Sequence, residues 1–194
     1  MIHEPYRSDE AAQGYVSWRE RSLARRLSRA YERWRILRAA GAGGRVLDMP
    51  CGGGRFPALA SCDRSPGMTR LAKARRAAAV RGDAFHLPFR QGAFDTALCV
   101  RLLHHFGAPQ QRAILAELRR VAARAVVTYF GTGGLKARRR RRKGARGTRR
   151  AIPSSEFRAI CASAGWRVSS DRAVLPLYSE QRVALLAALR AGPA

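Results

Sequence analysis

The stretch Arg45-Val-Leu-Asp-Met-Pro-Cys-Gly-Gly-Gly-Arg55 decides the fold of this chain of 194 residues. Val46 and Leu47 predict a short buried strand that ends at Asp48, and the glycines after it predict a tight turn. Glycines at the end of a strand adopt backbone torsions that other residues resist, and they let a ligand approach the main chain closely. The stretch therefore indicates either a simple turn or a ligand-binding turn.

Three further motifs follow in a fixed order, and together they favour the ligand-binding turn. They are the acidic Asp63, the sequence Gly82-Asp83-Ala84, and an apolar strand that begins at Phe94-Asp95. With the glycine turn, they resemble a class I S-adenosylmethionine-dependent methyltransferase over roughly residues 40 to 130. The segment Gly82-Asp-Ala-Phe-His-Leu-Pro-Phe89 is most similar to the small-molecule branch, which resembles the quinone and sterol methyltransferase-like domain.

The resemblance implies S-adenosylmethionine as the cofactor and assigns residues to it. Asp48 would orient the amino group of the methionine part, and the carboxylate of Asp63 would accept hydrogen bonds from both ribose hydroxyls. Asp83 would accept a hydrogen bond from the adenine amino group. The full set of implied cofactor-binding residues is Asp48, Pro50, Cys51, Gly52, Gly54, Asp63, Asp83, Ala84 and Arg101.

Two features depart from the family pattern. Pro50 stands where the family usually has glycine, and proline has no backbone N–H to donate. The interval from Gly54 to Asp63 has room for about one helical turn, over residues 56–60, and for a very short second strand. We therefore expect a shortened second-strand region. The alternative for Asp63, a surface turn residue paired with Arg64, stays open at this point.

The candidate catalytic residues are His104 and His105, in the segment Arg101-Leu-Leu-His-His-Phe106. This segment faces the transferred methyl group in related enzymes, and an imidazole can take a proton near neutral pH. The alternative is that both histidines only cap the next helix or bond to the cofactor loop; His86 is a weaker candidate. No pair of carboxylates, nucleophile–base pair or metal-binding cluster stands out in the sequence, so neither a hydrolase nor a metal site is expected.

The alternation of strands and helices predicts an α/β protein with a three-layer, Rossmann-like methyltransferase fold and a mostly parallel sheet. Residues 94–100 are nearly all apolar, as a central parallel strand should be. Residues 166–169 and 182–189 can form the antiparallel C-terminal strand pair that closes sheets of this family. The second of these segments could equally be a terminal helix, because its apolar residues are spaced by threes.

Residues 1–40 predict a helical segment in front of the S-adenosylmethionine-binding domain at 41–194. Apolar and aromatic residues recur on one helix face at Leu23, Leu27, Tyr31 and Trp34. Such a helix either packs on the domain or closes over the cofactor as a lid. In the second case Tyr15 and Trp18 would line the substrate mouth.

The formal net charge is +25, and all but three of the basic residues are arginine. This excess suits an anionic partner such as RNA or a lipid surface, but a GC-rich coding sequence also produces abundant arginine and alanine. A basic insertion at residues 136–150 consists mostly of Lys and Arg. Like charges at this density should stay solvated and mobile unless a partner neutralises them.

The leading functional hypothesis is methyl transfer to a small-molecule or lipid-linked acceptor, with an anionic acceptor as one option. An RNA methyltransferase that uses residues 136–150 for phosphate contacts is the first alternative, and a non-catalytic binding protein with this fold is the second. Scattered cysteines, no apolar run of membrane length and no signal-peptide pattern indicate a cytoplasmic protein. Peripheral attachment to an anionic membrane stays open.

Overall fold

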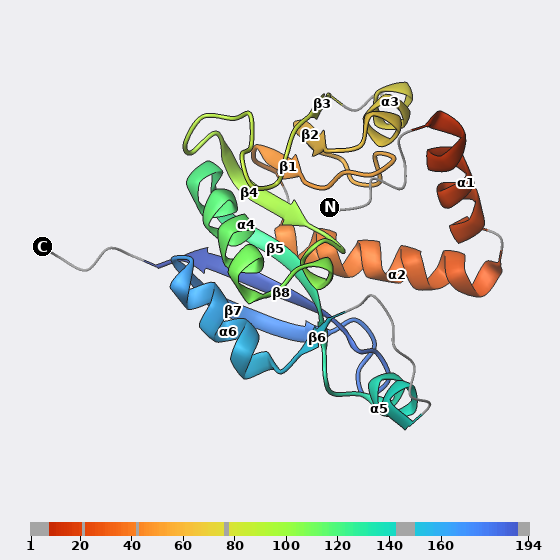
Figure 1. Ribbon diagram of the computed structural model, residues 1–194, viewed down its shortest axis with the longest axis vertical. Helices are drawn as coiled ribbons and strands as arrows, with labels where there is room; N and C mark the ends of the chain where they lie inside the picture. Colours follow the sequence, from red (N-terminus) through yellow and green to blue (C-terminus); the bar gives the residue numbers. More distant parts are fainter. Residues whose placement is uncertain (1–7, 21, 42, 76–77, 143–149, 190–194) are drawn as a thin grey trace, which may run out of the picture.

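The structure is a computed structural model of the chain that describes residues 8–20, 22–41, 43–75, 78–142 and 150–189. One mixed sheet organises it, with strands β1 (Val46–Asp48), β2 (Ala60–Asp63), β3 (Ala79–Arg81), β4 (Phe94–Cys99), β5 (Ala122–Gly131), β6 (Ala151–Ile152), β7 (Trp166–Ala173) and β8 (Gln181–Ala188). The order across the sheet is β3-β2-β1-β4-β5-β8-β7, and β6 pairs with β5 (Figure 1). Strands β1 to β6 are parallel, whereas β8 is antiparallel to β5 and β7 to β8.

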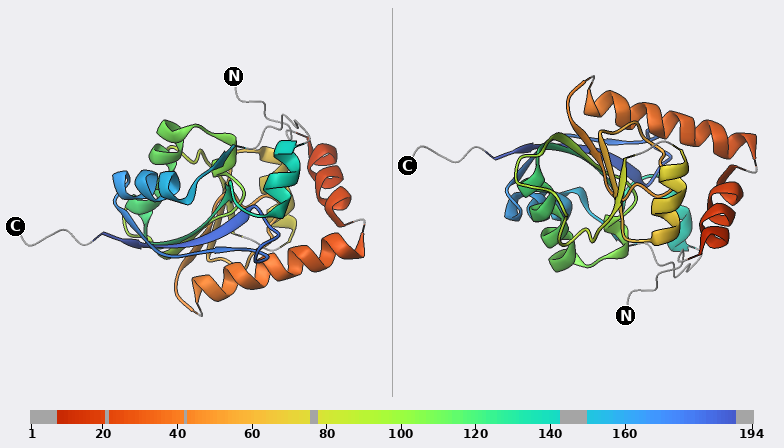
Figure 2. Two further views of the ribbon diagram at one scale, coloured as in Figure 1. Left: turned by 90° about the horizontal axis from the view of Figure 1, so that it is seen from below. Right: turned by 90° about the horizontal axis from the view of Figure 1, so that it is seen from above.

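Helices cover both faces of this sheet: α1 (Asp9–Glu20), α2 (Leu23–Ala40), α3 (Pro66–Ala74), the short 3₁₀ helix η1 (Leu103–His105), α4 (Ala108–Val121), α5 (Leu135–Arg142) and α6 (Ser154–Ser163). Helix α2 lies on one face, against β5 and β8, while α4 and α6 lie on the other (Figure 2). Helix α3 packs on β2 and β3, and α1 packs on α3. The expected three-layer fold and its antiparallel C-terminal strand pair are confirmed, and the alternative of a terminal helix after residue 181 is wrong.

Apolar residues fill the space on both sides of the central strands. Residues 125–130 of β5 are buried throughout, which explains why all of them except Thr128 are apolar or aromatic. The larger cluster lies between the sheet and helices α4 and α6, and includes Leu118, Phe157 and Trp166. A smaller cluster joins Ile36 and Ala40 of α2 to β4, β5 and β8. Burial on both faces fixes the sheet as the rigid base from which the loops at its carboxyl edge project.

The second strand exists, although the sequence left it in doubt. Strand β2 has four residues and pairs in parallel with both β1 and β3. No helix is present between β1 and β2, so the expected helical turn over residues 56–60 is not formed. The region is therefore shortened as expected, by loss of the whole helix and not of the strand.

The face that α2 presents to the domain differs from the expected one. Leu23, Leu27 and Trp34 are 50–68% exposed, whereas Glu32, Ile36 and Ala40 are at most 4% exposed. The apolar stripe of the sequence therefore points mostly to solvent, and a glutamate takes part in the packed face because two arginines neutralise it. In α1, Tyr15 is half-buried; the side chain of Trp18 lies outside the described residues.

The basic segment is partly helical. Residues 135–142 form the helix α5, which was not predicted from the sequence; Lys136, Arg138 and Arg139 on it are exposed to solvent, and residues 143–149 of the same run lie outside the described part. Ala137 is buried, and backbone contacts to the β7–β8 loop hold the start of the helix. Ser154 is the first residue of α6, and Pro153 occupies the cap position.

Candidate functional site: the carboxyl edge of the sheet

Asp48 ends β1 as a buried carboxylate. Its exposed fraction is 0%, and neither side-chain oxygen has a hydrogen-bond partner among the described residues. Burial raises the pKa of Asp48 well above its ordinary value, and the negative charge of Asp63 adds to the rise. The positive charge of Arg55 and the backbone N–H dipole of Phe56 oppose it. A buried polar group is normally satisfied, so Asp48 points to a cationic or hydrogen-bonding ligand.

Asp63 fastens the glycine turn to the end of β2. One of its oxygens, Oδ2, accepts a hydrogen bond from the Gly52 N–H at 2.8 Å, and Oδ1 accepts one from the Ser65 N–H at 2.9 Å. The N–H of Cys51 donates to the Cys62 carbonyl at 2.9 Å. Burial raises the pKa of Asp63, and the backbone donors oppose the rise. Asp63 thus braces the turn through hydrogen bonds to two backbone N–H groups, and its role toward the ribose stays a prediction.

Glycine at positions 52 and 54 of the turn serves two different structural purposes. Gly52 has φ +52°, and a Cβ built there meets no atom within 4 Å, so it faces open space. Gly54 has φ +72°, and a Cβ there would lie 3.2 Å from the Cα of Ala72 in α3. Gly54 therefore permits close packing of the turn on α3, whereas Gly52 keeps a surface open for a ligand.

The turn after β3 holds Asp83 and Ala84. Oδ1 of Asp83 accepts a hydrogen bond from the Phe85 N–H at 3.0 Å, and Oδ2 lies 4.0 Å from Nε of Arg64. Ala84 is half-buried and packs against the larger apolar cluster. Asp83 shapes this turn as Asp63 shapes the glycine turn: Oδ1 of each accepts a hydrogen bond from the backbone N–H two residues later, and Oδ2 of Asp63 also accepts one from Gly52.

A buried glutamate joins α2 to the ends of three other elements. Oε2 of Glu32 lies 2.8 Å from Nη2 of Arg101, just after β4, and 2.9 Å from Nη2 of Arg55, just after the glycine turn. Nε2 of Gln181, at the start of β8, donates to Glu32 Oε1 at 2.5 Å. Arg101 has φ +61°, and its N–H donates to Oγ1 of Thr128. The Arg101 guanidinium, expected at the cofactor, is therefore bound by Glu32.

The two candidate histidines have different environments. His104 is 6% exposed, and its ring packs edge-on against Phe130 at 4.7 Å between ring centroids. His105 is exposed, with its ring 4.0 Å from that of His104. The backbone carbonyl of His104 accepts a hydrogen bond from the N–H of Arg150. His86 is exposed in the turn after β3.

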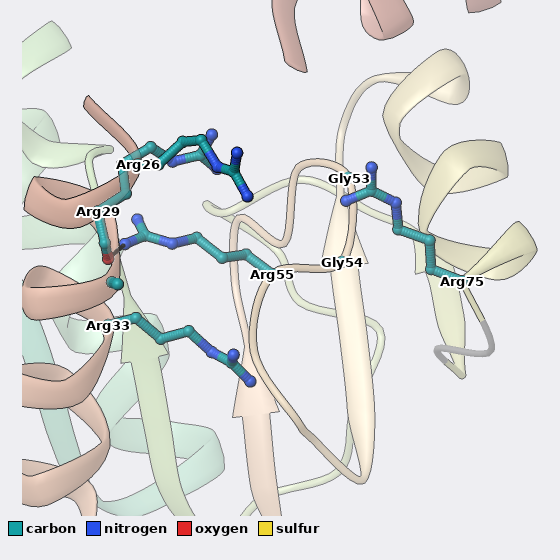
Figure 3. A pocket seen from close by; sticks show the side chains of 8 residues that line it. Arg26, Arg29, Arg33, Gly53, Gly54, Arg55 and Arg75 are labelled. Atoms are coloured by element: carbon teal, nitrogen blue, oxygen red, sulfur yellow. Dashed lines mark hydrogen bonds between the residues drawn. The ribbon is translucent and has the colours of Figure 1, made fainter. Parts of the chain in front are cut away.

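Two cavities open near these residues. The first, of about 570 Å³, lies between α2 and the glycine turn and is lined by Arg26, Arg29, Ala30, Arg33, Gly53, Gly54, Arg55 and Arg75. Figure 3 shows arginines of α2 facing Arg55, with Arg75 across the cavity beside the glycines. We call it the arginine cavity; its charge suits a carboxylate or a phosphate.

The second cavity, of about 170 Å³, lies at the carboxyl ends of β4 and β5, where Arg101 and Phe130 line it. Its other walls come from α2, the start of α5 and the β7–β8 loop: Ser28, Glu32, Lys136, Val174, Leu175, Tyr178, Ser179, Glu180 and Gln181. We call it the acceptor cavity. Ligands in open α/β sheets bind outside the carboxyl ends of the strands, where this cavity lies.

The residues present fit S-adenosylmethionine. The unpartnered carboxylate of Asp48 suits an ammonium, the open space at Gly52 suits close approach of a ligand, and the arginine cavity suits a carboxylate. Among the described residues, no group of three or more His, Cys, Asp or Glu side chains could hold a metal ion. In the same part of the chain, no helix is both long and apolar enough to cross a bilayer.

Sequence reasoning missed Glu32, the arginines of α2 and Arg55. Glu32 is spaced by four residues from Ile36 and by eight from Ala40, which is the only local signal that it faces inward. Its partners Arg55, Arg101 and Gln181 are all more than 20 residues away in sequence, so no local pattern predicts them.

Comparisons with known proteins agree with this geometry. The family model of a methyltransferase domain matches residues 40–130. A tRNA (carboxymethyluridine(34)-5-O)-methyltransferase of Xenopus tropicalis is 35% identical over 86 residues, which are 41% of this chain and 14% of that protein. A human protein named probable tRNA methyltransferase 9B is 30% identical over 102 residues, 48% of this chain and 22% of its own length.

The fold also matches a solved structure over nearly its whole length. Magnesium protoporphyrin IX methyltransferase from Synechocystis, solved with S-adenosylhomocysteine bound, has a TM-score of 0.73 at 18% identity, and the match covers 94% of this chain and 97% of that one. At this identity the likeness shows the fold, and the sequence relatives are matched over a small share of their length. The matched domain, the strand order and the motifs together show that this chain carries a class I S-adenosylmethionine-dependent methyltransferase domain, with S-adenosylmethionine as its cofactor.

Proposed function

We propose that this protein transfers the methyl group of S-adenosylmethionine to a small, lipid-linked acceptor that enters the acceptor cavity. The observation that carries the proposal is the composition of the cavity mouth. Leu175 and Tyr178 line the cavity and are 37% and 54% exposed, and the exposed Lys136 stands beside them. A mouth with apolar and cationic side chains suits an acceptor that has an apolar chain and an anionic group.

The cofactor supplies an activated methyl group, and the chain's residues hold the two reactants in line. Asp48 would accept hydrogen bonds from the cofactor ammonium, and the open backbone at Gly52 would let the methionine part approach. The remaining lone pairs of Asp63 would accept from the ribose, while Asp83 and the N–H of Ala84 would meet the adenine. Pro50 and Cys51 shape the turn below the ligand; burial raises the pKa of the Cys51 thiol, so it stays neutral.

Of the two histidines, His105 is the better candidate for a proton acceptor. It is exposed at the carboxyl edge, so it can reach an acceptor that must lose a proton. His104 is packed between Phe130 and His105, and its contribution is to hold the His105 ring in place.

A labelled-methyl assay tests the proposal. The protein is incubated with S-adenosylmethionine that carries a radioactive methyl group and with a total lipid extract, and the label in the organic phase is measured. We expect label in lipid, and we expect Lys136→Ser to lower it several-fold. Lys73→Ser, an exposed lysine on α3, is the matched control and should leave it unchanged. If no lipid fraction carries label, the proposed acceptor class is rejected.

RNA is the second candidate acceptor, and a separate observation favours it. The arginine cavity can bind phosphate groups, and the two sequence relatives described above carry tRNA methyltransferase names. In the same assay, label in acid-precipitable tRNA that falls steeply with salt would favour RNA over lipid. The label should be lost in Arg26→Ser with Arg33→Ser while calorimetric titration shows unchanged affinity for S-adenosylmethionine.

A further inference from the structure

An exposed apolar surface stands at the carboxyl edge of the sheet. It consists of Leu135 at the start of α5 and three residues of the β7–β8 loop, and the exposed fractions are 60% for Leu135, 37% for Leu175, 85% for Leu177 and 54% for Tyr178. We call these four residues the apolar tip. Single exposed leucines are ordinary, but a group of four on two joined segments is not.

Backbone hydrogen bonds hold the two segments of the tip together. The N–H of Leu135 donates to the carbonyl of Leu177 at 2.9 Å, and the N–H of Lys136 donates to the carbonyl of Tyr178 at 3.1 Å. Gly134 permits this approach, because a Cβ at that position would lie 3.0 Å from the Ser179 carbonyl oxygen. The tip is therefore a built surface and not a loose loop end.

Leu177 has an unfavourable backbone conformation, and its side chain is not packed against the protein. Its φ is +60°, a left-handed conformation that is unfavourable for a residue with a side chain, and the residue is 85% exposed. Strain of this kind persists at sites where the side chain serves a partner. The conformation directs an apolar side chain away from the protein.

Cations accompany the tip on the same helix. Lys136, Arg138 and Arg139 are exposed on α5, whose sequence contains no acidic residue, and Glu180 in the adjoining loop is 2% exposed. Apolar side chains that enter the boundary of a bilayer, with arginines and lysines at the level of the headgroups, are the pattern of proteins that bind anionic membrane surfaces. RNA would use the cations but would gain little from three leucines.

We propose that the apolar tip inserts into the surface of an anionic lipid bilayer, with the cations of α5 on the headgroups. The inference rests on the proposed function, because Leu175 and Tyr178 belong both to the tip and to the wall of the acceptor cavity. A protein docked in this way presents the cavity to the membrane, so a lipid-linked acceptor reaches it without leaving the bilayer.

Vesicle co-sedimentation tests the docking without any measurement of catalysis. The probes are vesicles of phosphatidylcholine alone and of phosphatidylcholine mixed with phosphatidylglycerol. We expect binding to the mixed vesicles that is at least tenfold weaker in Leu135→Ser with Leu177→Asn, where asparagine tolerates the φ of Leu177. The matched control is Leu59→Ser, because Leu59 is also 60% exposed but lies before β2, at the amino edge of the sheet.

The contribution of the α5 cations to vesicle binding is tested in the same experiment. Arg138→Ser with Arg139→Ser should weaken binding to the mixed vesicles and reduce its dependence on salt, whereas Arg90→Ser with Arg167→Ser, also exposed, should do neither. Unchanged binding of the tip variant, or equal binding of the native protein to neutral and anionic vesicles, would overturn the proposal. Binding to tRNA but to neither vesicle would overturn it too and assign the surface to RNA.

Turnover separates this inference from the proposed function. With an acceptor dissolved in detergent, the variant Leu135→Ser with Leu177→Asn should keep its turnover, since neither residue lines the acceptor cavity. Vesicle binding by a protein that labels no lipid would reject the proposed acceptor and leave the docking standing. Labelling of lipid by a protein that binds no vesicle would reject the docking alone.

Discussion

The carboxylate of Glu32 holds the guanidinium of Arg101 through two hydrogen bonds, from Nε at 2.9 Å and from Nη2 at 2.8 Å. Glu32 is 1% exposed, and Arg101 has a positive φ at the point where β4 enters the loop of the candidate histidines. Arg55, which follows the glycine turn, pairs with the same carboxylate. One side chain of α2 thus holds the glycine turn and the loop after β4 together.

Removal of this carboxylate should destabilise the protein strongly. Glu32→Gln leaves two arginines facing each other without an anion, and loss of one partner of a buried ion pair costs about 3–5 kcal/mol. We expect a decrease of this order in the free energy of unfolding, measured with urea. Asp95→Asn, which breaks the exposed pair with Arg45, is the control and should change stability little. Equal effects of the two substitutions would contradict the assigned role.

Asp48→Asn should have opposite effects on stability and on cofactor binding. Burial raises the pKa of Asp48 in the folded protein, so the folded state binds the proton more tightly than the unfolded chain, and stability falls as the pH rises above the unfolded value of about 4. The cofactor-free variant should therefore lose less stability than the native protein between pH 4 and pH 8; a smaller slope of the same sign remains from Asp63.

The same variant should bind S-adenosylmethionine about tenfold or more weakly, because a charge-assisted hydrogen bond is lost. Calorimetric titration and thermal unfolding across pH measure the two effects. A variant with native affinity would show that Asp48 does not meet the cofactor.

Gly52→Ala and Gly54→Ala should separate binding from packing. At Gly54 the new methyl group would meet α3, so we expect a clear loss of thermal stability. At Gly52 it would enter open space, so the cost is mainly the backbone strain of about 1 kcal/mol, while cofactor binding should fall sharply. The melting temperature of each variant and its dissociation constant for S-adenosylmethionine measure the two effects. If Gly52→Ala keeps its affinity, the turn is not the cofactor's binding surface.

Substitution of the two histidines should likewise separate an effect on activity from an effect on stability. His105→Ala should lower turnover and leave cofactor affinity and melting temperature near native values, because its side chain is exposed. His104→Ala should lower the melting temperature, since its ring is packed against Phe130. Rescue of His105→Ala by added imidazole would identify a proton transfer. Native turnover in His105→Ala would exclude it as a base.

The sequence predicts those elements whose structure depends on residue type and on near neighbours in the chain. The strand that ends at Asp48, the positive-φ glycines and the apolar strand β4 follow from residue types and short-range patterns, and the structure confirms them. The existence of β2 depended on neighbours in β1 and β3, and the helicity of α5 on backbone contacts to the β7–β8 loop. The inward face of α2 depended on arginines far along the chain, so hydrophobic spacing alone gave the wrong face.

The bond between Glu32 and Gln181 joins residues 149 positions apart, and this separation bears on the order in which the protein folds during synthesis. Helix α2 is synthesised well before Val174, Gln181 and Val183, against which it packs. Until these residues are made, its buried glutamate and Ile36 lack their final surroundings. Strand β8 therefore completes the packing of α2, and the nascent chain must remain unaggregated with this helix undocked until that strand has been synthesised.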